Sequence, residues 1–378
     1  MTNHKDRAHA LLSASSSSRW LACPPSAMAN EAYPDIETEF ANEGTTAHEV
    51  AEAIARMRLD PTTKVEMPHG YNTEMVHCAE EYADYIEEQK KSNDAIVLLE
   101  RRVDFSSWVP EGFGTCDCLI IQDDTLTIID YKYGQGVPVS ATNNPQLRLY
   151  ALGAMNDYGD VLGITKIEMH IFQPRLNNVQ DDKITAEELM AWANKTVKPT
   201  AEKAIKGKGK YAPGEHCRFC QHAGRCRALT KLCTEYLDTH GLRVSVPVLA
   251  PYEVADILRM EPMVTLWLKK VKDQALSTLM NGEELPGYKL VEGKLGNRKW
   301  RNDREVFDKL IENGFNENDI TETKVLTPSQ MDKAIGKKKA AELLEEFIER
   351  APGAPTIAPI TDKRPAYDRL AEAQNDFK

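Results

Sequence analysis

The stretch FGTCDCLIIQDDTLTIIDYKY, residues 113–133, decides the fold of this chain. Two β-rich segments in it flank an Asp-Asp pair, and this pattern predicts a hairpin of two strands. Each segment contains one further acidic residue, Asp117 in the first and Asp130 in the second. Asp130 and Lys132 are two positions apart, so their side chains leave the same face of a strand. The stretch therefore predicts two neighbouring strands that carry two carboxylates and a lysine.

Periodicity on both sides of this hairpin predicts a layered α/β core. Thr46 and Glu49 have the spacing of a capping box, which predicts that the first long helix begins there. Asn144 followed by Pro145 predicts the start of another helix. The predicted order is two helices, three strands, a helix and a strand, over residues 46–60, 73–91, 95–103, 113–121, 125–133, 144–155 and 166–174. This order predicts a mixed sheet flanked by helices.

The chain is expected to contain a core domain and an accessory region. We predict a core domain over residues 1–240, a helical and basic accessory region over 241–350, and an extended Pro-rich tail over 351–378. Within the accessory region a helix is predicted over 247–281. A Thr-Pro-Ser-Gln capping box that starts at Thr327 predicts another helix, which runs to about residue 350.

The composition is that of a soluble globular protein. The 378 residues are 42% hydrophobic and 28% charged, with a net charge of −11. No apolar run approaches the roughly 20 residues that a membrane-spanning helix needs, and the N-terminus lacks the apolar segment of a signal peptide. We therefore expect a cytoplasmic protein with no membrane partner. In that compartment the eight cysteines are expected to be buried thiols or metal ligands rather than disulfides.

Four of the cysteines predict a metal centre that closes a long loop. Cys217, Cys220 and Cys226 have the spacing C-x2-C-x5-C, and Cys23 can supply a fourth thiolate from far upstream. Spacing alone is compatible with a structural zinc site. In such a site one cysteine could be replaced by either of two neighbouring histidines, His216 and His222.

The other four cysteines are expected to be ordinary buried thiols. Cys116 and Cys118 flank Asp117, so strand alternation predicts that both point to the buried face opposite that carboxylate. Cys78 and Cys233 belong to no motif.

Two basic stretches on this acidic chain predict a path for phosphate groups. Residues 201–231 carry eight lysines and arginines against two glutamates, and residues 294–304 carry a second basic group around Trp300. Such a local basic patch is typical of a surface that binds nucleic acid. The candidate DNA-binding residues are Lys206, Lys208, Lys210, Arg218, Arg225, Arg298, Lys299 and Arg301.

Polar motifs follow one another in a fixed order along the predicted core. They are Gly-Thr-x-x-His ending at His48, Gly-x-x-Asp ending at Asp117, Asp-Tyr-Lys at 130–132, and Gln-x-x-x-Tyr at 146–150. Carboxylates bind Mg²⁺ or Mn²⁺, an imidazole also suits Mn²⁺, and a neighbouring lysine can orient or deprotonate a water. The glutamine and the tyrosine share a helix face because they are four residues apart. The set predicts a metal-dependent hydrolytic site.

This ordered set resembles the PD-(D/E)xK nuclease superfamily, in its RecB-type branch. The resemblance covers about residues 13–235 and implies a restriction-endonuclease-like fold with a mixed central sheet. It implies metal ligands at His48, Asp117 and Asp130, of which the two carboxylates are also catalytic. The carbonyl of Tyr131 is expected to join the metal shell.

The same resemblance implies roles for the remaining motif residues. Lys132 corresponds to the catalytic lysine, and Gln146 and Tyr150 correspond to groups that orient the site. Glu100 stands at the strand position where relatives often carry a glutamate near the metal.

The cysteine spacing resembles that of AddB-type and CRISPR-associated RecB-like nucleases, a subset of this branch. The resemblance implies a [4Fe–4S] cluster bound by Cys23, Cys217, Cys220 and Cys226, in preference to zinc. The cluster is expected to have a structural role.

The resemblance implies a Mg²⁺- or Mn²⁺-dependent deoxyribonuclease, with exonuclease action on DNA that has an accessible end or a single-stranded region. The C-terminal third resembles a family of phage and prophage proteins that carry this core. That likeness implies work in phage DNA replication, recombination or processing, with proteins of those processes as partners, in the cytoplasm of a bacterial host. Two alternatives remain: a non-catalytic nucleic-acid-binding or assembly protein on the same scaffold, and a zinc-stabilised interaction module.

Overall fold

The computed structural model of the chain describes residues 10–33, 39–240, 251–289, 303–312 and 326–348. Contacts between residues divide the chain into two units, Met1–Glu322 and Thr323–Lys378, and each is described by itself. The domain boundaries expected at residues 240 and 350 remain predictions.

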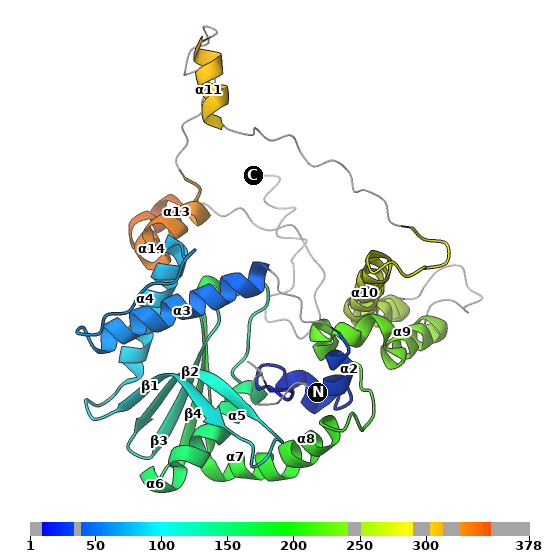
Figure 1. Ribbon diagram of the computed structural model, residues 1–378, viewed down its shortest axis with the longest axis horizontal. Helices are drawn as coiled ribbons and strands as arrows, with labels where there is room; N and C mark the ends of the chain where they lie inside the picture. The colour runs from blue at the N-terminus through cyan, green and yellow to red at the C-terminus, as the bar shows by residue number, and fades with distance from the viewer. Residues whose placement is uncertain (1–9, 34–38, 241–250, 290–302, 313–325, 349–378) are drawn as a thin grey trace, which may run out of the picture. The chain divides into compact units, whose positions relative to one another are not determined.

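One five-stranded mixed sheet forms the centre of the first unit (Figure 1). Its strands lie side by side in sequence order: β1 (Ile96–Asp104), β2 (Phe113–Gln122), β3 (Thr125–Tyr131), β4 (Lys166–Gln173) and β5 (Asn178–Thr185). Neighbouring strands are antiparallel except β3 and β4, which are parallel. A parallel pair needs a crossover connection, and here the crossover contains helix α5 (Pro145–Ala154).

Helices cover both faces of this sheet, so the predicted mixed sheet with flanking helices is confirmed (Figure 1). α3 (Glu39–Leu59) and α4 (Thr73–Gln89) pack on one face through buried apolar residues. On the other face lie α5, α7 (Ala186–Trp192) and the short N-terminal helix α1 (Ser17–Ala22). In Figure 1 the first pair lies above the sheet, and α5 and α7 lie below it.

Helix α5 begins where the sequence predicts. The side chain of Asn144 accepts hydrogen bonds from the backbone N–H groups of Gln146 and Leu147, at 3.0 and 3.4 Å, and Pro145 occupies the first turn. Side-chain capping satisfies donors that the first turn of a helix cannot use internally. This cap fixes the start of the helix that carries Tyr150.

Helix α3 begins earlier than predicted. Thr46 is an interior residue of a helix that starts at Glu39, so the expected capping box at residues 46–49 is wrong. Glu43, in the additional turns, forms an ion pair of 3.4 Å with Arg175 beyond β4. This contact between distant parts of the chain outweighs the local signal, which is weak by comparison.

Strand β5 and helix α7 are not among the predicted elements. β5 is an edge strand whose residues alternate between half-buried and exposed, and of its eight residues only Val179 and Ile184 are apolar. Edge strands often carry charged side chains, which weakens the period-two hydrophobic pattern. β5 passes directly into α7, where Thr185 and Glu188 form a capping box.

Helical structure follows the cysteine-rich turns, in α9 (Arg227–His240) and α10 (Pro251–Met280). The helix predicted over 247–281 is thus confirmed over its described part. α10 packs on α9, and Trp267 Nε1 donates to Thr230 Oγ1 at 3.2 Å. In the described residues no helix is both long and apolar enough to cross a membrane.

The second unit contains the predicted Thr327 capping box but not the single long helix. Gln330 N–H donates to Thr327 Oγ1 at 3.4 Å, and Thr327 N–H donates to Gln330 Oε1 at 3.0 Å. α13 (Pro328–Ile335) then ends because Gly336 has a φ of 85°, which a helix cannot accommodate. α14 (Lys337–Leu344) follows, and the tail over 351–378 lies outside the described residues.

Gly153→Ala is expected to destabilise the first unit. Gly153 lets α5 approach β1 closely, because an added Cβ would lie 2.7 Å from Val103 Cβ and 3.1 Å from the Asp104 backbone nitrogen. Strand and helix would have to separate, and overpacking of this kind costs about 1–3 kcal/mol of unfolding free energy. Urea denaturation of the variant and the parent measures this loss.

Gly44→Ala is the matched control. Gly44 lies inside α3 with nothing within 4 Å of an added Cβ. Alanine is the better helix former by roughly 0.5–1 kcal/mol, so this variant should be as stable as the parent or more stable. Equal effects of the two substitutions would contradict the close packing of α5 on β1.

Candidate functional site

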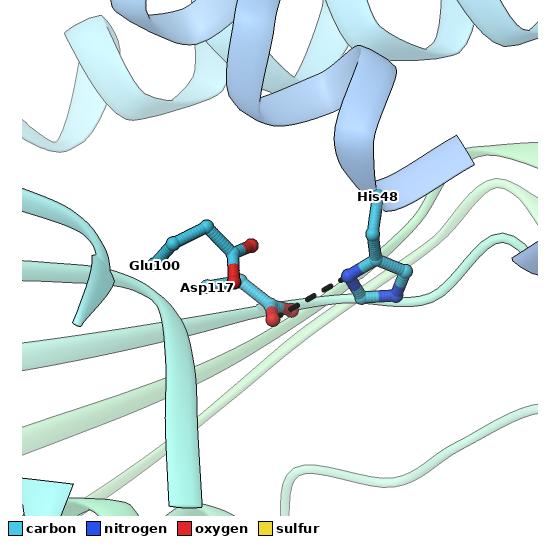
Figure 2. Close-up of side chains that lie close together, drawn as sticks. All are labelled: His48, Glu100 and Asp117. Atoms are coloured by element: carbon cyan, nitrogen blue, oxygen red, sulfur yellow. Dashed lines mark ion pairs between the residues drawn. The ribbon is translucent and has the colours of Figure 1, made fainter. Parts of the chain in front are cut away.

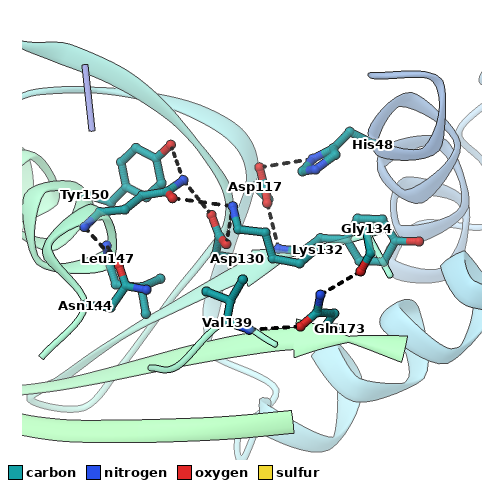
Figure 3. Close-up of polar contacts among 12 residues, drawn as sticks. His48, Asp117, Asp130, Lys132, Gly134, Val139, Asn144, Leu147, Tyr150 and Gln173 are labelled. Carbon is teal, nitrogen blue, oxygen red and sulfur yellow. Dashed lines mark hydrogen bonds and ion pairs between the residues drawn. The ribbon is translucent and has the colours of Figure 1, made fainter. Parts of the chain in front are cut away.

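The candidate site lies where β2 and β3 separate. Their ladder ends at the pair Cys118–Ile129. The carboxylate of Asp117 occupies the opening beyond this pair, and its Oδ2 accepts a hydrogen bond of 2.7 Å from the Tyr131 N–H (Figure 3). A side chain of one strand thus satisfies a backbone donor of the other where the ladder has stopped.

The alternation of side chains changes at the same level of β1 and β2. Glu100 has a φ of 47°. Leu99 packs on the α3–α4 face and Val103 on the α5 face, although regular alternation would place both on one face. Cys118 and Cys116 are divided between the two faces in the same way. Both are buried as predicted, but the prediction that they share a face is wrong because the strands are irregular here.

His48, Glu100 and Asp117 converge from α3, β1 and β2, and we call them the metal group (Figure 2). Each offers a ligand atom within 4.8 Å of those of the others, and His48 Nδ1 lies 3.4 Å from Asp117 Oδ1. Two carboxylates and an imidazole form a donor set that suits Mn²⁺ and, through the oxygens, Mg²⁺. The structure therefore brings His48 and Asp117 together, as predicted, and adds Glu100 to them.

Burial and mutual charge set the pKa values of the metal group. Burial, reinforced by the nearby Asp117 carboxylate, raises the pKa of Glu100 to about 7. Burial alone would lower the pKa of His48, but Asp117 outweighs it, so the pKa of His48 is raised. Burial would likewise raise the pKa of Asp117, but His48 outweighs it and that pKa is lowered. Two carboxylates crowded in a partly buried site repel each other, and a bound cation relieves that repulsion.

Asp130, Lys132, Gln146 and Tyr150 form a second, connected set beside the metal group, which we call the lysine group (Figure 3). Lys132 Nζ lies 2.7 Å from Asp130 Oδ2. Gln146 Nε2 donates to Asp130 Oδ1 at 3.0 Å and to Tyr150 Oη at 3.1 Å, while Gln146 Oε1 accepts from Lys132 at 3.4 Å. All four predicted residues of this part of the site come together. The role of Asp130 as a third metal ligand remains a prediction.

The charges of the lysine group depend on each other. Burial would lower the pKa of Lys132, but Asp130 and Asp117 outweigh it, and the pKa is raised. Burial raises the pKa of Asp130 despite the attraction of Lys132. Removing Lys132 would leave the buried Asp130 carboxylate without its cationic partner, which is strongly unfavourable.

Arg175 joins the helices beside the site to the end of β4, and no motif in the sequence predicts this role. Its side chain is 10% exposed and lies 4.4 Å above the ring of Tyr133. It donates to both carboxylate oxygens of Glu74 on α4, at 3.3 Å each, and to Glu43 on α3 at 3.4 Å. Glu43 precedes His48 by little more than one helical turn, so Arg175 holds this end of α3 near the strand ends. A single arginine between a strand and a turn gives no spacing signal.

The four predicted cysteines line one cavity, and we call them the cysteine cluster: Cys23, Cys217, Cys220 and Cys226. Cys23 follows α1, and the other three come from tight turns that precede α9. All four are buried. The structure thus places Cys23 beside the other three cysteines, although most of the core lies between them in the sequence. His216 and His222 line the same cavity, so the zinc alternative with a histidine ligand stays open.

Asn30 joins the two chain segments that form the cysteine cluster. Its Oδ1 accepts from the Gln221 N–H at 2.8 Å, and its Nδ2 donates to Cys220 Sγ at 3.3 Å and to the Ser26 carbonyl at 2.7 Å. The Gly214 N–H donates to the sulfur of Cys217 in a similar way, at 3.4 Å. N–H donors to sulfur stabilise thiolates that bind a metal or cluster. The sequence does not predict this role of Asn30, because its contacts with Cys220 and Gln221 span almost two hundred residues.

The candidate DNA-binding residues fall into two groups. Five of them are exposed in the segment between α7 and α9: Lys206, Lys208, Lys210, Arg218 and Arg225. The other three lie outside the described residues: Arg298, Lys299 and Arg301.

A family model described as "Protein of unknown function (DUF2800)" matches residues 9–365. The chain belongs to the DUF2800 family. The matched range of this DUF2800 chain contains the metal group, the lysine group and the cysteine cluster. A solved structure titled "Crystal structure of SSO0001" matches at 14% identity, over 47% of this chain and 96% of that chain, with a TM-score of 0.23. A likeness this low does not establish a shared fold.

Glu100→Gln is expected to weaken Mn²⁺ binding by the DUF2800 chain about tenfold or more, because it removes one anionic donor from the metal group. Isothermal titration calorimetry with Mn²⁺ measures the change. Glu52→Gln is the matched control, since Glu52 lies one turn beyond His48 on α3 and pairs with Arg56 at 2.7 Å. Equal weakening in both variants would show that general negative charge, rather than the metal group, attracts the ion.

Proposed function

We propose that this DUF2800 chain is a metal-dependent deoxyribonuclease of the PD-(D/E)xK type, with exonuclease action on phosphodiester bonds in DNA. The observation that carries the proposal is the meeting of the metal group and the lysine group at one end of the sheet. Asp117 belongs to the metal group and contacts the strand end that carries Lys132. A cation site and a buried lysine side by side are the two charge-stabilising elements that phosphoryl transfer needs.

The residues of the metal group fit a divalent cation. His48, Glu100 and Asp117 would hold it. Burial and then the Asp117 charge raise the pKa of Glu100 to about 7, so both carboxylates would gain a counter-charge when the cation binds. Mg²⁺ or Mn²⁺ bound there would supply Lewis acidity toward the oxygens of a phosphodiester. Asp130 would join the metal ligands if Lys132 turned from it toward the substrate.

The lysine group would position and stabilise the reacting phosphate. Lys132 is a partly buried ammonium, with 25% of its side chain exposed, so its hydrogens can point to a non-bridging phosphate oxygen or to the attacking water. Gln146 is hydrogen-bonded to both Asp130 and Lys132, and Gln146 also donates to the hydroxyl of Tyr150. Catalysis would then rest on orientation and preorganised charge rather than on a covalent intermediate.

We further propose that the cysteine cluster binds a [4Fe–4S] cluster with a structural role. Four buried thiols on a common cavity, with N–H groups directed at two of the sulfurs, support a thiolate-bound centre. Structural zinc remains the alternative for the same ligands. The partners of the protein would be DNA with an accessible end or a single-stranded region, and proteins of phage replication or recombination.

The competing function is a non-catalytic nucleic-acid-binding or assembly protein on this scaffold. It requires the same basic surface but not the buried lysine beside two carboxylates. Because burial of these charges is costly, their joint presence favours the enzyme.

Lys132→Met is expected to lower cleavage of linear DNA with Mg²⁺ or Mn²⁺ by about 10²-fold or more, since one charge-stabilising donor is lost. End-labelled linear and closed circular DNA, single- and double-stranded, report both rate and mode of cleavage. Loss of linear DNA alone indicates an exonuclease, whereas cutting of circles indicates an endonuclease.

Lys183→Met is the matched control for this experiment. Lys183 pairs with Glu168 at 3.3 Å on the exposed side of β5, away from both groups. Its variant should cleave at the parent rate. Undiminished metal-dependent cleavage by Lys132→Met would remove Lys132 from the proposed mechanism, and DNA binding without cleavage in the parent would favour the scaffold function.

Cys23→Ala is expected to abolish the visible absorption band of protein purified without oxygen and to reduce bound iron strongly. Without the centre, the two segments joined by Asn30 lose a crosslink, so the variant should also unfold at lower temperature. Cys233→Ala is the control, because Cys233 is buried nearby on α9 but does not line the cavity. Bound zinc with no visible band in the parent would replace the iron–sulfur proposal with a zinc site.

A further inference from the structure

Exposed cationic side chains lie in the segment that carries Cys217, Cys220 and Cys226. Lys210, Arg218 and Arg225 are exposed, and no ion pair is found for Lys210 or Arg218 among the described residues. By contrast, Arg148 on α5 and Arg175 in the turn after β4 each contact a carboxylate. Positive charge that the described part of the protein leaves unpaired is available to an anionic ligand.

Aromatic rings stand among these cations. Phe219 is 67% exposed and directly follows Arg218 in the turn η5 (Glu215–Phe219). Cys217 in this turn and Cys220 just after it are buried, and the Cys220 N–H donates to the Cys217 carbonyl at 3.2 Å. The turn therefore presents this ring outward.

Tyr211 is the second exposed ring, at 44%. It lies 5.9 Å from the ring of His222, with 33° between the planes, and His222 Nδ1 is 3.2 Å from the hydroxyl of Tyr33. Arg225 lies near this ring pair, because burial is the largest cause that lowers the pKa of His222 and the charge of Arg225 is the second. Arg225 also donates to Thr278 of α10 at 3.2 Å. Tyr211 thus contacts His222 and lines the cavity of the cysteine cluster, while 44% of the residue stays exposed.

Flat exposed rings beside unpaired cations fit one class of ligand best. Unpaired nucleotides offer base faces for stacking and a phosphate at each step, whereas a duplex hides the base faces. Binding to an anionic membrane would require an amphipathic helix with a broad apolar face, and this segment consists of short turns.

We propose that Lys210, Tyr211, Arg218, Phe219 and Arg225 form a binding face for single-stranded nucleic acid, here called the stacking face. Phe219 and Tyr211 stack on bases, and the three cations contact phosphates. The inference deepens the proposed function, because it assigns binding of a single-stranded region to a face that needs neither metal nor cleavage. It rests on that function only in choosing nucleic acid among polyanions.

The test measures binding of the full chain, purified without oxygen, to labelled oligothymidylate of about 20 nucleotides and to a duplex of equal length, in EDTA. Phe219→Leu keeps an apolar side chain but removes the aromatic face. It is expected to weaken single-strand binding about fivefold or more and duplex binding less than about twofold. Tyr288→Ala, which removes another exposed aromatic ring (74%) outside the stacking face, is expected to bind as the parent does.

Salt dependence separates the two kinds of contact. Arg218→Gln is expected to weaken binding to both nucleic acids and to reduce the slope of log affinity against log salt by about one, whereas Phe219→Leu leaves the slope unchanged. The visible band of each variant, where the parent has one, and its circular dichroism should match those of the parent. This control excludes loss of the cluster or of the fold as the cause.

Several results would overturn the stacking face. They are parent-like single-strand binding by Phe219→Leu, equal weakening for duplex, no oligothymidylate binding by the parent, or binding to vesicles that contain phosphatidylserine instead. Failure of the proposed function looks different. A parent that binds oligothymidylate but cleaves no DNA with metal keeps the stacking face and loses the nuclease. If the parent cleaves DNA with metal but Phe219→Leu binds oligothymidylate as the parent does, the nuclease proposal stands and the stacking face is wrong.

Discussion

The hydrogen bond from the Tyr131 N–H to the Asp117 carboxylate is the contact on which the rest of the site depends. It lies where β2 and β3 stop pairing, and it occupies a backbone donor that would otherwise be unsatisfied in a buried place. With one oxygen fixed by the backbone, the other is directed to His48. The lysine group follows β3 past the same point, so both charged groups are placed by one opening in the sheet.

Burying so much charge is unfavourable unless each group has a partner. Asp130 has Lys132 and Gln146, and Asp117 has His48 and a backbone donor, but the raised pKa of Glu100, about 7, marks a carboxylate with too little compensation. Arg175 adds a second constraint, since it fixes α3 and α4 against the strand ends. A cation at the metal group would compensate the charge of Glu100, and the contacts of Arg175 would keep the surrounding helices in place.

Much of this arrangement can be predicted from residues that act locally. The cap at Asn144, the hairpin around Asp123-Asp124 and the mixed sheet follow from short-range rules, and the Asp-Tyr-Lys and Gln-x-x-x-Tyr motifs place Lys132 beside Gln146. What could not be predicted depends on distant contacts. The early start of α3 needs Arg175, the division of Cys116 and Cys118 between two faces needs the irregular backbone at Glu100, and β5 has too few apolar residues to be recognised.

The position of Trp20 has a consequence for synthesis of the chain. Trp20 is fully buried in the core on the α5 face, with its indole N–H bonded to the Ser13 carbonyl at 3.0 Å, and Cys23 follows it at the end of α1. All five strands, through Thr185, leave the ribosome before Cys217 does. The nascent sheet can therefore hold Cys23 in place while its partner thiols are still being translated, which leaves assembly of the cysteine cluster as a late step of folding.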